Sequence, residues 1–234
     1  MSKKPIVVVT GTGPGTGSAV VRRFAKEGYR VMMLARSPGV IGALEKELPD
    51  CHAIVCDVSD EVQVRRAAAV IRDEHGVPEI LVHNAVGGGW GNFMDIEPKL
   101  LNRNFQVNVM GLLYLAREFA PAMVEAGAGA IVVTGNTSAL RGKANFAGFA
   151  PTKAAQRILS ESMARELGPK GVHVAYLLVD AVIDVPWTRE RFSDAADSFF
   201  IKPAAIADEV WHLCQQDRSA WSFLSELRPF GENW

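Results

Sequence analysis

Short apolar runs alternate with helical segments along the whole chain, and this alternation restricts the fold more than any other feature. The early runs are continuously apolar, which is typical of strands that are covered on both faces of a parallel sheet. Strands and helices in this order are joined by right-handed crossovers. We therefore expect a single doubly wound α/β domain over residues 1–234, with helices on both faces of a mostly parallel sheet of about seven strands.

The expected strands cover residues 5–11, 30–35, 52–58, 79–85, 129–135, 172–179 and 221–228. The expected helices cover residues 16–28, 40–48, 60–75, 98–126, 151–168 and 203–216. Residues 180–201 form the least regular segment and follow the sixth strand. Ligands of such folds bind beyond the carboxyl ends of the strands, so we expect this segment to act as a lid over a substrate.

Composition and charge exclude several classes of protein. The chain is 48% hydrophobic and has a formal net charge of -1, so no nucleic-acid or membrane-surface footprint is expected. No apolar run approaches the roughly 18 residues of a membrane-spanning helix. The cysteines Cys51, Cys56 and Cys214 are odd in number and the histidines are scattered. We expect reduced thiols, a cytoplasmic protein and no metal site.

A glycine-rich turn, GTGPGTG, separates the first strand from the first helix. Glycine lets the backbone approach a ligand closely, and the free N–H groups at a helix N-terminus attract anions. Its place between strand and helix predicts a pyrophosphate site. The residues expected there are Gly11, Gly13, Gly15, Thr16 and Gly17. The alternative is a turn that only joins tightly packed elements.

The residues after the second strand indicate which dinucleotide is bound. Folds that select NAD usually place a carboxylate there, whereas this chain has Ala35, followed by Arg36 and Ser37. A guanidinium beside a hydroxyl suits a ribose 2′-phosphate, because it donates paired hydrogen bonds to phosphate oxygens. We expect NADP(H) to be preferred over NAD(H); the alternative is that Arg36 is a solvated loop residue.

With these motifs in place, the chain resembles the short-chain dehydrogenase/reductase family over nearly its whole length. The matching residues are Thr10, Gly11, Gly15 and Gly17 in the turn, Asp57 and Val58 after the third strand, Asn84 and Ala85 after the fourth, and Asn108 in NVMG. The resemblance implies a Rossmann-type domain with Asp57 and Val58 at the adenine ring. It also implies that the backbone of Ile183 holds the nicotinamide carboxamide.

The catalytic residues of that family are only partly present. Its serine, tyrosine and lysine correspond to Asn136, Phe149 and Lys153. The resemblance implies that Lys153 binds the nicotinamide ribose, while Asn108 anchors a water and the lysine. The chain is similar to a side branch of the family that has phenylalanine in place of the tyrosine.

Phe149 changes the expected chemistry, because a phenyl ring cannot donate a proton. Removing a general acid typically costs about 10²–10⁴ in rate, so ketone reduction by the usual route is disfavoured. We expect Phe149 to be a wall of the pocket and Asn136 to orient a substrate atom. Lys153 either only holds the ribose or is itself the proton source, directly or through a water. Alternatively, Thr137 or Ser138 lends the missing hydroxyl.

The sequence also departs from the family pattern at three other positions. Val86 replaces a glycine after the fourth strand, and Asp180-Ala181 replaces a proline-glycine pair after the sixth. Val185 replaces the threonine that holds the carboxamide. These changes place the docking of the nicotinamide in question.

Three functions stay open. The first is an NADP(H)-dependent oxidoreductase with altered proton handling and a small-molecule substrate. The second is a catalytically silent dinucleotide-binding protein, either a redox sensor or a supporting subunit. The third is a lyase or isomerase that reuses the pocket without a dinucleotide.

Several aromatic and apolar residues bear on the substrate and on assembly. Loop residues Trp90, Phe93, Arg141 and Trp187 suggest an aromatic pocket. The helices at 98–126 and 151–168 are apolar on more than one face, and in the family they form a dimer interface. We therefore expect a homodimer or homotetramer. The aromatic residues of the C-terminal tail either cover the sheet edge or close a neighbouring subunit's pocket: Trp221, Phe223, Phe230 and Trp234.

Overall fold

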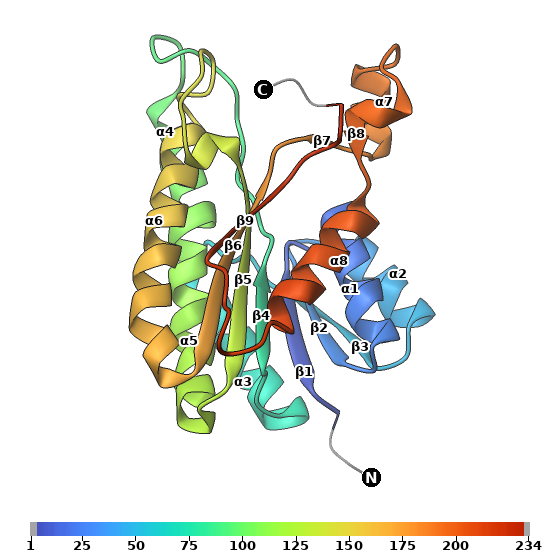
Figure 1. The fold of residues 1–234 in the computed structure, drawn as a ribbon, viewed down its shortest axis with the longest axis vertical. Helices are drawn as coiled ribbons and strands as arrows, with labels where there is room; N and C mark the ends of the chain where they lie inside the picture. The colour runs from blue at the N-terminus through green and yellow to red at the C-terminus, as the bar shows by residue number, and fades with distance from the viewer. Residues whose placement is uncertain (1–3, 232–234) are drawn as a thin grey trace.

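A computed structural model describes residues 4–231 of the chain, and its centre is a sheet of seven strands in which all neighbours are parallel (Figure 1). The strands follow the order β3-β2-β1-β4-β5-β6-β9. Their bounds are β1 Ile6–Thr10, β2 Arg30–Ala35, β3 Cys51–Val55, β4 Ile80–His83, β5 Gly129–Asn136, β6 Val172–Val179 and β9 Leu224–Leu227. The reversal of order beside β1 is that of a doubly wound sheet, so the predicted fold class is confirmed.

Helices cover both faces of this sheet, as Figure 1 shows. One face carries α1 (Thr16–Lys26), α2 (Pro38–Glu47) and α8 (Pro203–Cys214), whose apolar residues share one hydrophobic cluster with the sheet. The other face carries α3 (Glu61–Val70), α5 (Gly111–Ala126) and α6 (Ala150–Leu167), which share a second cluster. In β1, Val7 and Val9 face the first cluster, while Ile6 and Val8 face the second. Burial on both faces explains the continuous apolar runs of the strands.

All six helices depart from the expected ranges, α1, α2 and α8 by at most two residues at an end, and the other three run into a helical turn of another type. The predicted helix 98–126 is α4 (Pro98–Phe105), a π-helical turn (Gln106–Met110) and then α5. The predicted helix 60–75 is likewise α3 followed by a π-helical turn (Ile71–His75). The helix predicted to end at Gly168 continues as a 3₁₀ turn, and the left-handed glycine is Gly171, with φ +86°.

The irregular segment after β6 has local structure that its sequence pattern does not indicate. It contains β7 (Val182–Ile183), α7 (Pro186–Arg191) and β8 (Phe200–Ile201), with β7 and β8 paired in a small sheet. In Figure 1 these elements lie together above α8, beyond the carboxyl ends of the central strands.

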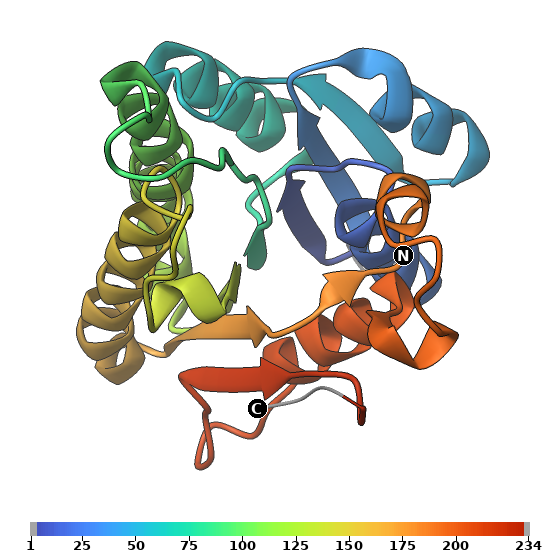
Figure 2. The same cartoon turned by 90° about the horizontal axis from the view of Figure 1, so that it is seen from above.

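The C-terminal tail covers one edge of the sheet, because it contributes the edge strand β9, which pairs with β6 (Figure 2). Trp221 stacks on His173 of β6 with ring centroids 4.9 Å apart, and Phe223 packs against the core. Phe230 is 95% exposed, and Trp234 lies outside the described residues.

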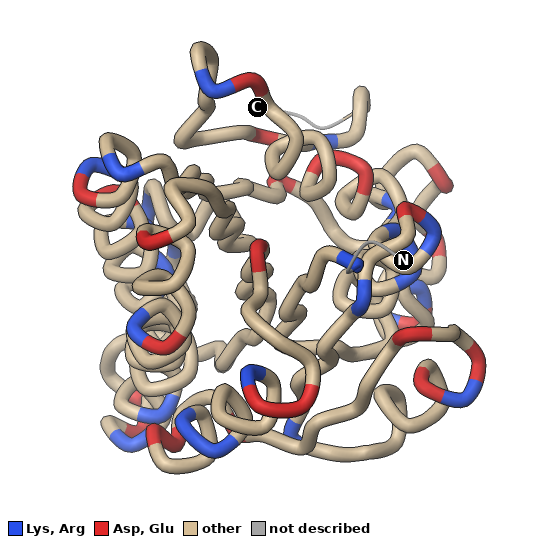
Figure 3. Tube along the Cα trace, turned by 90° about the horizontal axis from the view of Figure 1, so that it is seen from below, with Lys and Arg blue, Asp and Glu red and all other residues tan. Residues whose placement is uncertain are grey.

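Acidic and basic residues are interspersed along the Cα trace in Figure 3. No helix among the described residues is long and apolar enough to cross a membrane. Within residues 4–231, no cluster of three or more His, Cys, Asp or Glu side chains could hold a metal ion.

Candidate functional site

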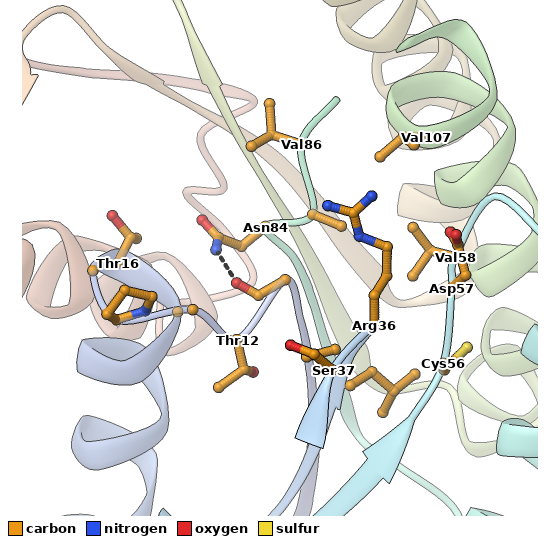
Figure 4. A pocket seen from close by; sticks show the side chains of 18 of the residues that line it. Thr12, Thr16, Arg36, Ser37, Cys56, Asp57, Val58, Asn84, Val86 and Val107 are labelled. Carbon is orange, nitrogen blue, oxygen red and sulfur yellow. Dashed lines mark hydrogen bonds between the residues drawn. The ribbon is translucent and has the colours of Figure 1, made fainter. Parts of the chain in front are cut away.

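A cleft of about 380 Å³ opens beyond the carboxyl ends of β1, β2, β3 and β4 (Figure 4). The turn after β1, the end of β2 and the segments after β3 and β4 line it. The residues expected to bind a cofactor line it too, apart from Lys153: Gly11, Gly13, Gly15, Thr16, Gly17, Arg36, Ser37, Asp57, Val58, Asn84, Ala85 and Ile183. Residues that are far apart in the sequence therefore meet in one cavity.

The glycine-rich turn packs too closely against its surroundings to accept side chains at two positions. Gly11 has φ +67°, and a Cβ atom there would lie 2.5 Å from the backbone of Ala85. A Cβ atom on Gly17 would lie 2.5 Å from the carbonyl oxygen of Gly11. The side-chain amide of Asn84 donates to that same carbonyl at 2.9 Å, as the dashed line in Figure 4 marks. The turn is therefore fixed against β4.

The N-terminus of α1 offers unused hydrogen-bonding groups to the cleft. Its N-cap residue, Gly15, makes no side-chain cap, and the first turn holds no acidic residue. Thr16 Oγ1 is buried with no hydrogen-bond partner among the described residues. Positive dipole, free backbone donors and an orphaned hydroxyl suit the phosphate groups of a dinucleotide, so the residues present fit such a ligand.

The far side of the cleft combines a cation with a carboxylate that is already engaged. In Figure 4, Arg36 extends from the end of β2 between Asn84 and the Asp57-Val58 pair. One oxygen of Asp57 accepts hydrogen bonds from the backbone N–H and the hydroxyl of Ser59, at 3.0 and 2.7 Å. The Arg36 guanidinium makes no hydrogen bond or ion pair within residues 4–231, so its donors are available to an anion.

Lys153 lies beside a second cavity of about 160 Å³, which it lines together with Asn136. The two cavities adjoin, because they share the lining residues Thr16, Asn84, Val86 and Ile183. Lys153 projects from the first turn of α6 and is only 2% exposed. Its Nζ donates to the backbone carbonyl of Thr134 at 3.1 Å and to Oε1 of Gln156. Burial lowers the pKa of Lys153 from its ordinary value to about 7.

Asn108 is fully buried in the π-helical turn before α5 and does not line either cavity. Its side chain exchanges two hydrogen bonds with the backbone of Gly87, at 2.8 and 2.9 Å, and donates to Thr152 at 2.8 Å. Its backbone carbonyl accepts a hydrogen bond from Gln156 at 2.7 Å. Asn108 therefore ties the loop after β4 to α6, and it reaches Lys153 through Gln156.

The ring of Phe149 is buried at the N-cap of α6 and lines neither cavity. Its centroid lies 6.1 Å from that of Trp90, which packs edge-on against Phe146 at 4.4 Å. The structure thus places Phe149 in an aromatic cluster next to α6.

The other residues expected near a substrate are divided between two places. Trp187 lines the cleft beside the glycine-rich turn, whereas Phe93 and Arg141 line a separate open groove. Ser138, one alternative source of a hydroxyl, lines that groove and not the Lys153 cavity. Asn136 accepts a hydrogen bond from the backbone of Ser138 at 3.1 Å, which leaves its amide N–H groups free to donate.

The segment 180–201 borders the cleft through Ile183, Val185 and Trp187. Val185 reaches the glycine-rich turn, since a Cβ atom on Gly15 would lie 2.9 Å from its Cγ1. Arg189 fixes the segment internally: it pairs with Asp184 at 2.6 and 2.8 Å and with Asp197 at 2.6 Å.

Sequence reasoning missed three buried polar residues around Lys153. His83 and Tyr176 lie within two predicted apolar strands, and Gln156 lies within a predicted helix; no role is assigned to any of them from the sequence. All three are fully buried on the α5/α6 side of the sheet. A polar residue inside an apolar run is the signal that could have found them.

The fold and the cleft define a class of α/β proteins that bind a nucleotide where the strand order reverses. The family model described as short chain dehydrogenase matches residues 5–195, and the chain belongs to this family of oxidoreductases.

Named relatives agree with this assignment. D-erythrulose reductase of Gallus gallus is 32% identical over 168 residues, covering 71% of this chain and 67% of that protein. NADPH carbonyl reductase 2 of Sus scrofa is 30% identical over 170 residues, with the same coverage of 71% and 67%. A crystal structure of a metagenomic short-chain oxidoreductase in complex with NADP superposes with a TM-score of 0.84 at 28% identity, covering 97% of this chain and 99% of that one.

Proposed function

We propose that this protein is an NADP(H)-dependent oxidoreductase that acts on a small molecule with altered proton handling. One observation carries the proposal: a single cleft combines the tight glycine turn, the uncapped N-terminus of α1 and the available guanidinium of Arg36. NADP is also bound in the related metagenomic oxidoreductase. Bound NADP(H) would supply or accept the hydride.

Different lining residues would contact different parts of the cofactor. The glycine turn and Thr16 would hold the pyrophosphate, and Arg36 with Ser37 would hold the ribose 2′-phosphate. Asp57 and Val58 would border the adenine ring. Lys153 would bind the nicotinamide ribose in the adjoining cavity, and Ile183, which lines both cavities, would hold the carboxamide by its backbone.

Phe149 limits the substrates that such a site can process. Acceptors that already carry a positive charge, such as iminium ions, do not need a phenol to protonate them. Enones and quinones can take their proton from solvent. The amide N–H groups of Asn136 in the Lys153 cavity would orient the oxygen or nitrogen of such a substrate. We also propose that the chain belongs to a branch of the family that has phenylalanine in place of the catalytic tyrosine.

The test is hydride transfer from deuterium-labelled NADPH to a panel of iminium, enone and quinone acceptors. We expect deuterium in at least one product, and turnover that is lost in Lys153→Ala. Thr137→Ala and Ser138→Ala are the matched controls and should keep turnover. No deuterium transfer to any acceptor, by a protein that binds NADPH, would refute the enzymatic part of the proposal.

A catalytically silent dinucleotide-binding protein is the second candidate, and the missing hydroxyl at Phe149 favours it. This candidate binds NADPH equally well but transfers no hydride. Phe149→Tyr offers a further distinction: gain of ketone reduction would show that the rest of the site is competent and that only the proton step has been lost.

We also propose that the protein is a cytoplasmic homodimer or homotetramer assembled through α4, α5 and α6. Phe105 of α4 and Ile158 of α6 are 39% and 51% exposed, which leaves apolar surface for a second copy. Light scattering of the purified protein should give a mass of at least twice that of one chain, and a Phe105→Asp, Ile158→Asp variant should be monomeric.

A further inference from the structure

Lys153 belongs to a buried polar cluster that the proposed function does not fully use. The cluster lies under α6 and contains Lys153 and Gln156 of that helix, His83 of β4 and Tyr176 of β6. Each is at most 2% exposed. Groups buried so completely need internal partners, and those partners determine which way Lys153 is directed.

The amide of Gln156 is fixed in orientation because each of its ends has a different partner. Its Nε2 donates to the carbonyl of Asn108 at 2.7 Å. Its Oε1 accepts from Lys153 Nζ, and the hydroxyl of Tyr176 lies 3.5 Å from the same oxygen. A reversed amide would place two donors together at Lys153 and two acceptors together at Asn108. The oxygen of Gln156 therefore faces the lysine.

Lys153 Nζ then has two of its three positions occupied. The carbonyls of Thr134 and Gln156 accept hydrogen bonds from it, and Lys153 also lines the cavity shared with Asn136. A neutral amine would use both of its N–H bonds on these two acceptors, so its lone pair would point to the third position. An ammonium would point its third N–H there instead. In both states the group left over is able to exchange a proton.

The titratable groups that face Lys153 from neighbouring strands do not carry a negative charge. Burial first, and then the charge of Lys153, lower the pKa of His83 to about 3, so this ring is neutral near pH 7. Burial raises the pKa of Tyr176, so its hydroxyl also stays neutral. Burial in these neutral surroundings is what lowers the pKa of Lys153 to about 7.

We propose that Gln156 is a positioning residue which, with the Thr134 carbonyl, directs Lys153 to exchange a proton with a ligand in the adjoining cavity. This inference rests on the proposed function for the identity of that ligand. When Lys153 donates, an N–H bond breaks, an O–H or N–H bond forms on the ligand, and the electron pair stays on Nζ. Water then returns a proton to the amine, and the reverse sequence applies when Lys153 accepts.

The experiment follows the protonation of Lys153 directly in the protein without cofactor. The chain is labelled with ¹³C-lysine, and the Cε signal of Lys153, assigned by its loss in Lys153→Arg, is titrated with pH. Gln156→Met removes the acceptor at nearly constant volume, and Gln156→Glu replaces it with a carboxylate. Ser160→Ala is the matched control, because Ser160 donates to the backbone of Gln156 at 2.8 Å and makes no contact with Lys153 among the described hydrogen bonds.

We expect the pKa of Lys153 to fall in Gln156→Met and to rise by about 1 or more in Gln156→Glu, since a nearby carboxylate favours the charged form. It should not change in Ser160→Ala. If the role of Gln156 were merely structural, the two substitutions would not shift the pKa of Lys153 in opposite directions. If neither variant changes the pKa, or if both change it in the same direction, the inference is wrong.

The ligand is tested separately by adding NADPH to the same labelled protein, with binding measured by calorimetry. A change in the Lys153 signal on saturation supports a third position that faces the ligand. Binding with no change in that signal overturns the inference while leaving the proposed function intact. Absence of binding overturns the proposed function, and the titrations without cofactor still decide the role of Gln156.

Discussion

The backbone carbonyl of Thr134 accepts a hydrogen bond from Nζ of Lys153 at 3.1 Å, and this contact begins a path from the buried lysine to the cleft beside the glycine-rich turn. The hydroxyl of the same Thr134 donates to Asn84 at 2.9 Å, and Asn84 donates to Gly11 at 2.9 Å. A continuous series of contacts therefore runs from α6 to the glycine-rich turn. It links an ionisable group with a shifted pKa to the turn between β1 and α1.

Lys153→Met should stabilise the protein most at low pH. The folded protein releases the Lys153 proton near pH 7, whereas the unfolded chain holds it up to about pH 10.5. Between these values the unfolded chain binds more protons, so wild-type stability should rise with pH by up to about 1.4 kcal/mol per pH unit. The Met variant lacks this dependence.

Urea unfolding of both proteins at several pH values measures this effect. The advantage of Lys153→Met in free energy of unfolding should be largest below pH 7 and should shrink toward pH 10. The His83 titration, with a folded pKa of about 3 and an ordinary value of 6.5, lies below this range. A constant difference between the two proteins from pH 7 to pH 10 would contradict a lowered pKa at Lys153.

Two glycines of the turn should respond very differently to alanine. In Gly17→Ala the new Cβ would lie 2.5 Å from the carbonyl oxygen of Gly11, whereas in Gly13→Ala the nearest atom is the same oxygen at 4.0 Å. Overpacking costs about 1–3 kcal/mol, which lowers the melting temperature of a chain of this size by about 3–10 °C. Gly13→Ala is the control and should melt within about 2 °C of wild type; equal melting temperatures for the two variants would contradict the packing described here.

Arg36→Ala should weaken NADPH binding by about 10–100-fold, because hydrogen bonds to a charged group contribute about 1.5–3 kcal/mol. NADH binding should change by less than about threefold, since NADH lacks the 2′-phosphate. Arg65→Ala removes the same charge from α3, where the side chain pairs with Glu61, and serves as the control. If Arg36→Ala weakens the binding of NADPH and NADH equally, Arg36 does not bind the 2′-phosphate.

Arg189→Met should loosen the segment that borders the cleft. Arg189 pairs with Asp184 and Asp197, and its guanidinium lies 4.0 Å from the ring centroid of Phe200. Hydrogen exchange over residues 184–201 should become faster while exchange in the central sheet stays the same. Arg191→Met, which removes a 5.8 Å contact with Phe192, is the comparison and should have little effect. Unchanged exchange in Arg189→Met would show that these ion pairs do not hold the segment.

The fold and the cleft could be predicted from the sequence because both follow from local patterns. Each of the seven predicted strand segments contains one of the seven parallel strands or most of it, and the early segments are the continuously apolar ones. The turn from Gly11 to Gly17 has the backbone conformation and the close contacts that only glycine permits at two of its positions. Since a parallel sheet brings the carboxyl ends of its strands to one edge, Arg36 after β2 and Asn84 after β4 line one cleft.

The surroundings of Lys153 could not be predicted, because they depend on which side chains meet across the α6–sheet interface. Gln156, His83 and Tyr176 come from a helix and two strands, and no local pattern pairs them. The structure of the segment after β6 could not be predicted from local sequence patterns either. Its helix α7 is short, and side-chain ion pairs such as that of Arg189 with Asp197 connect α7 to the chain that follows it.

Calorimetric titration of the purified protein with NADPH and, separately, with NADH tests the central claim most directly. We expect micromolar binding of NADPH that is much tighter than binding of NADH, because Arg36 is the residue that we propose holds the 2′-phosphate. Absence of binding for both dinucleotides would contradict it, and the enzymatic and the silent dinucleotide-binding functions would then fail together.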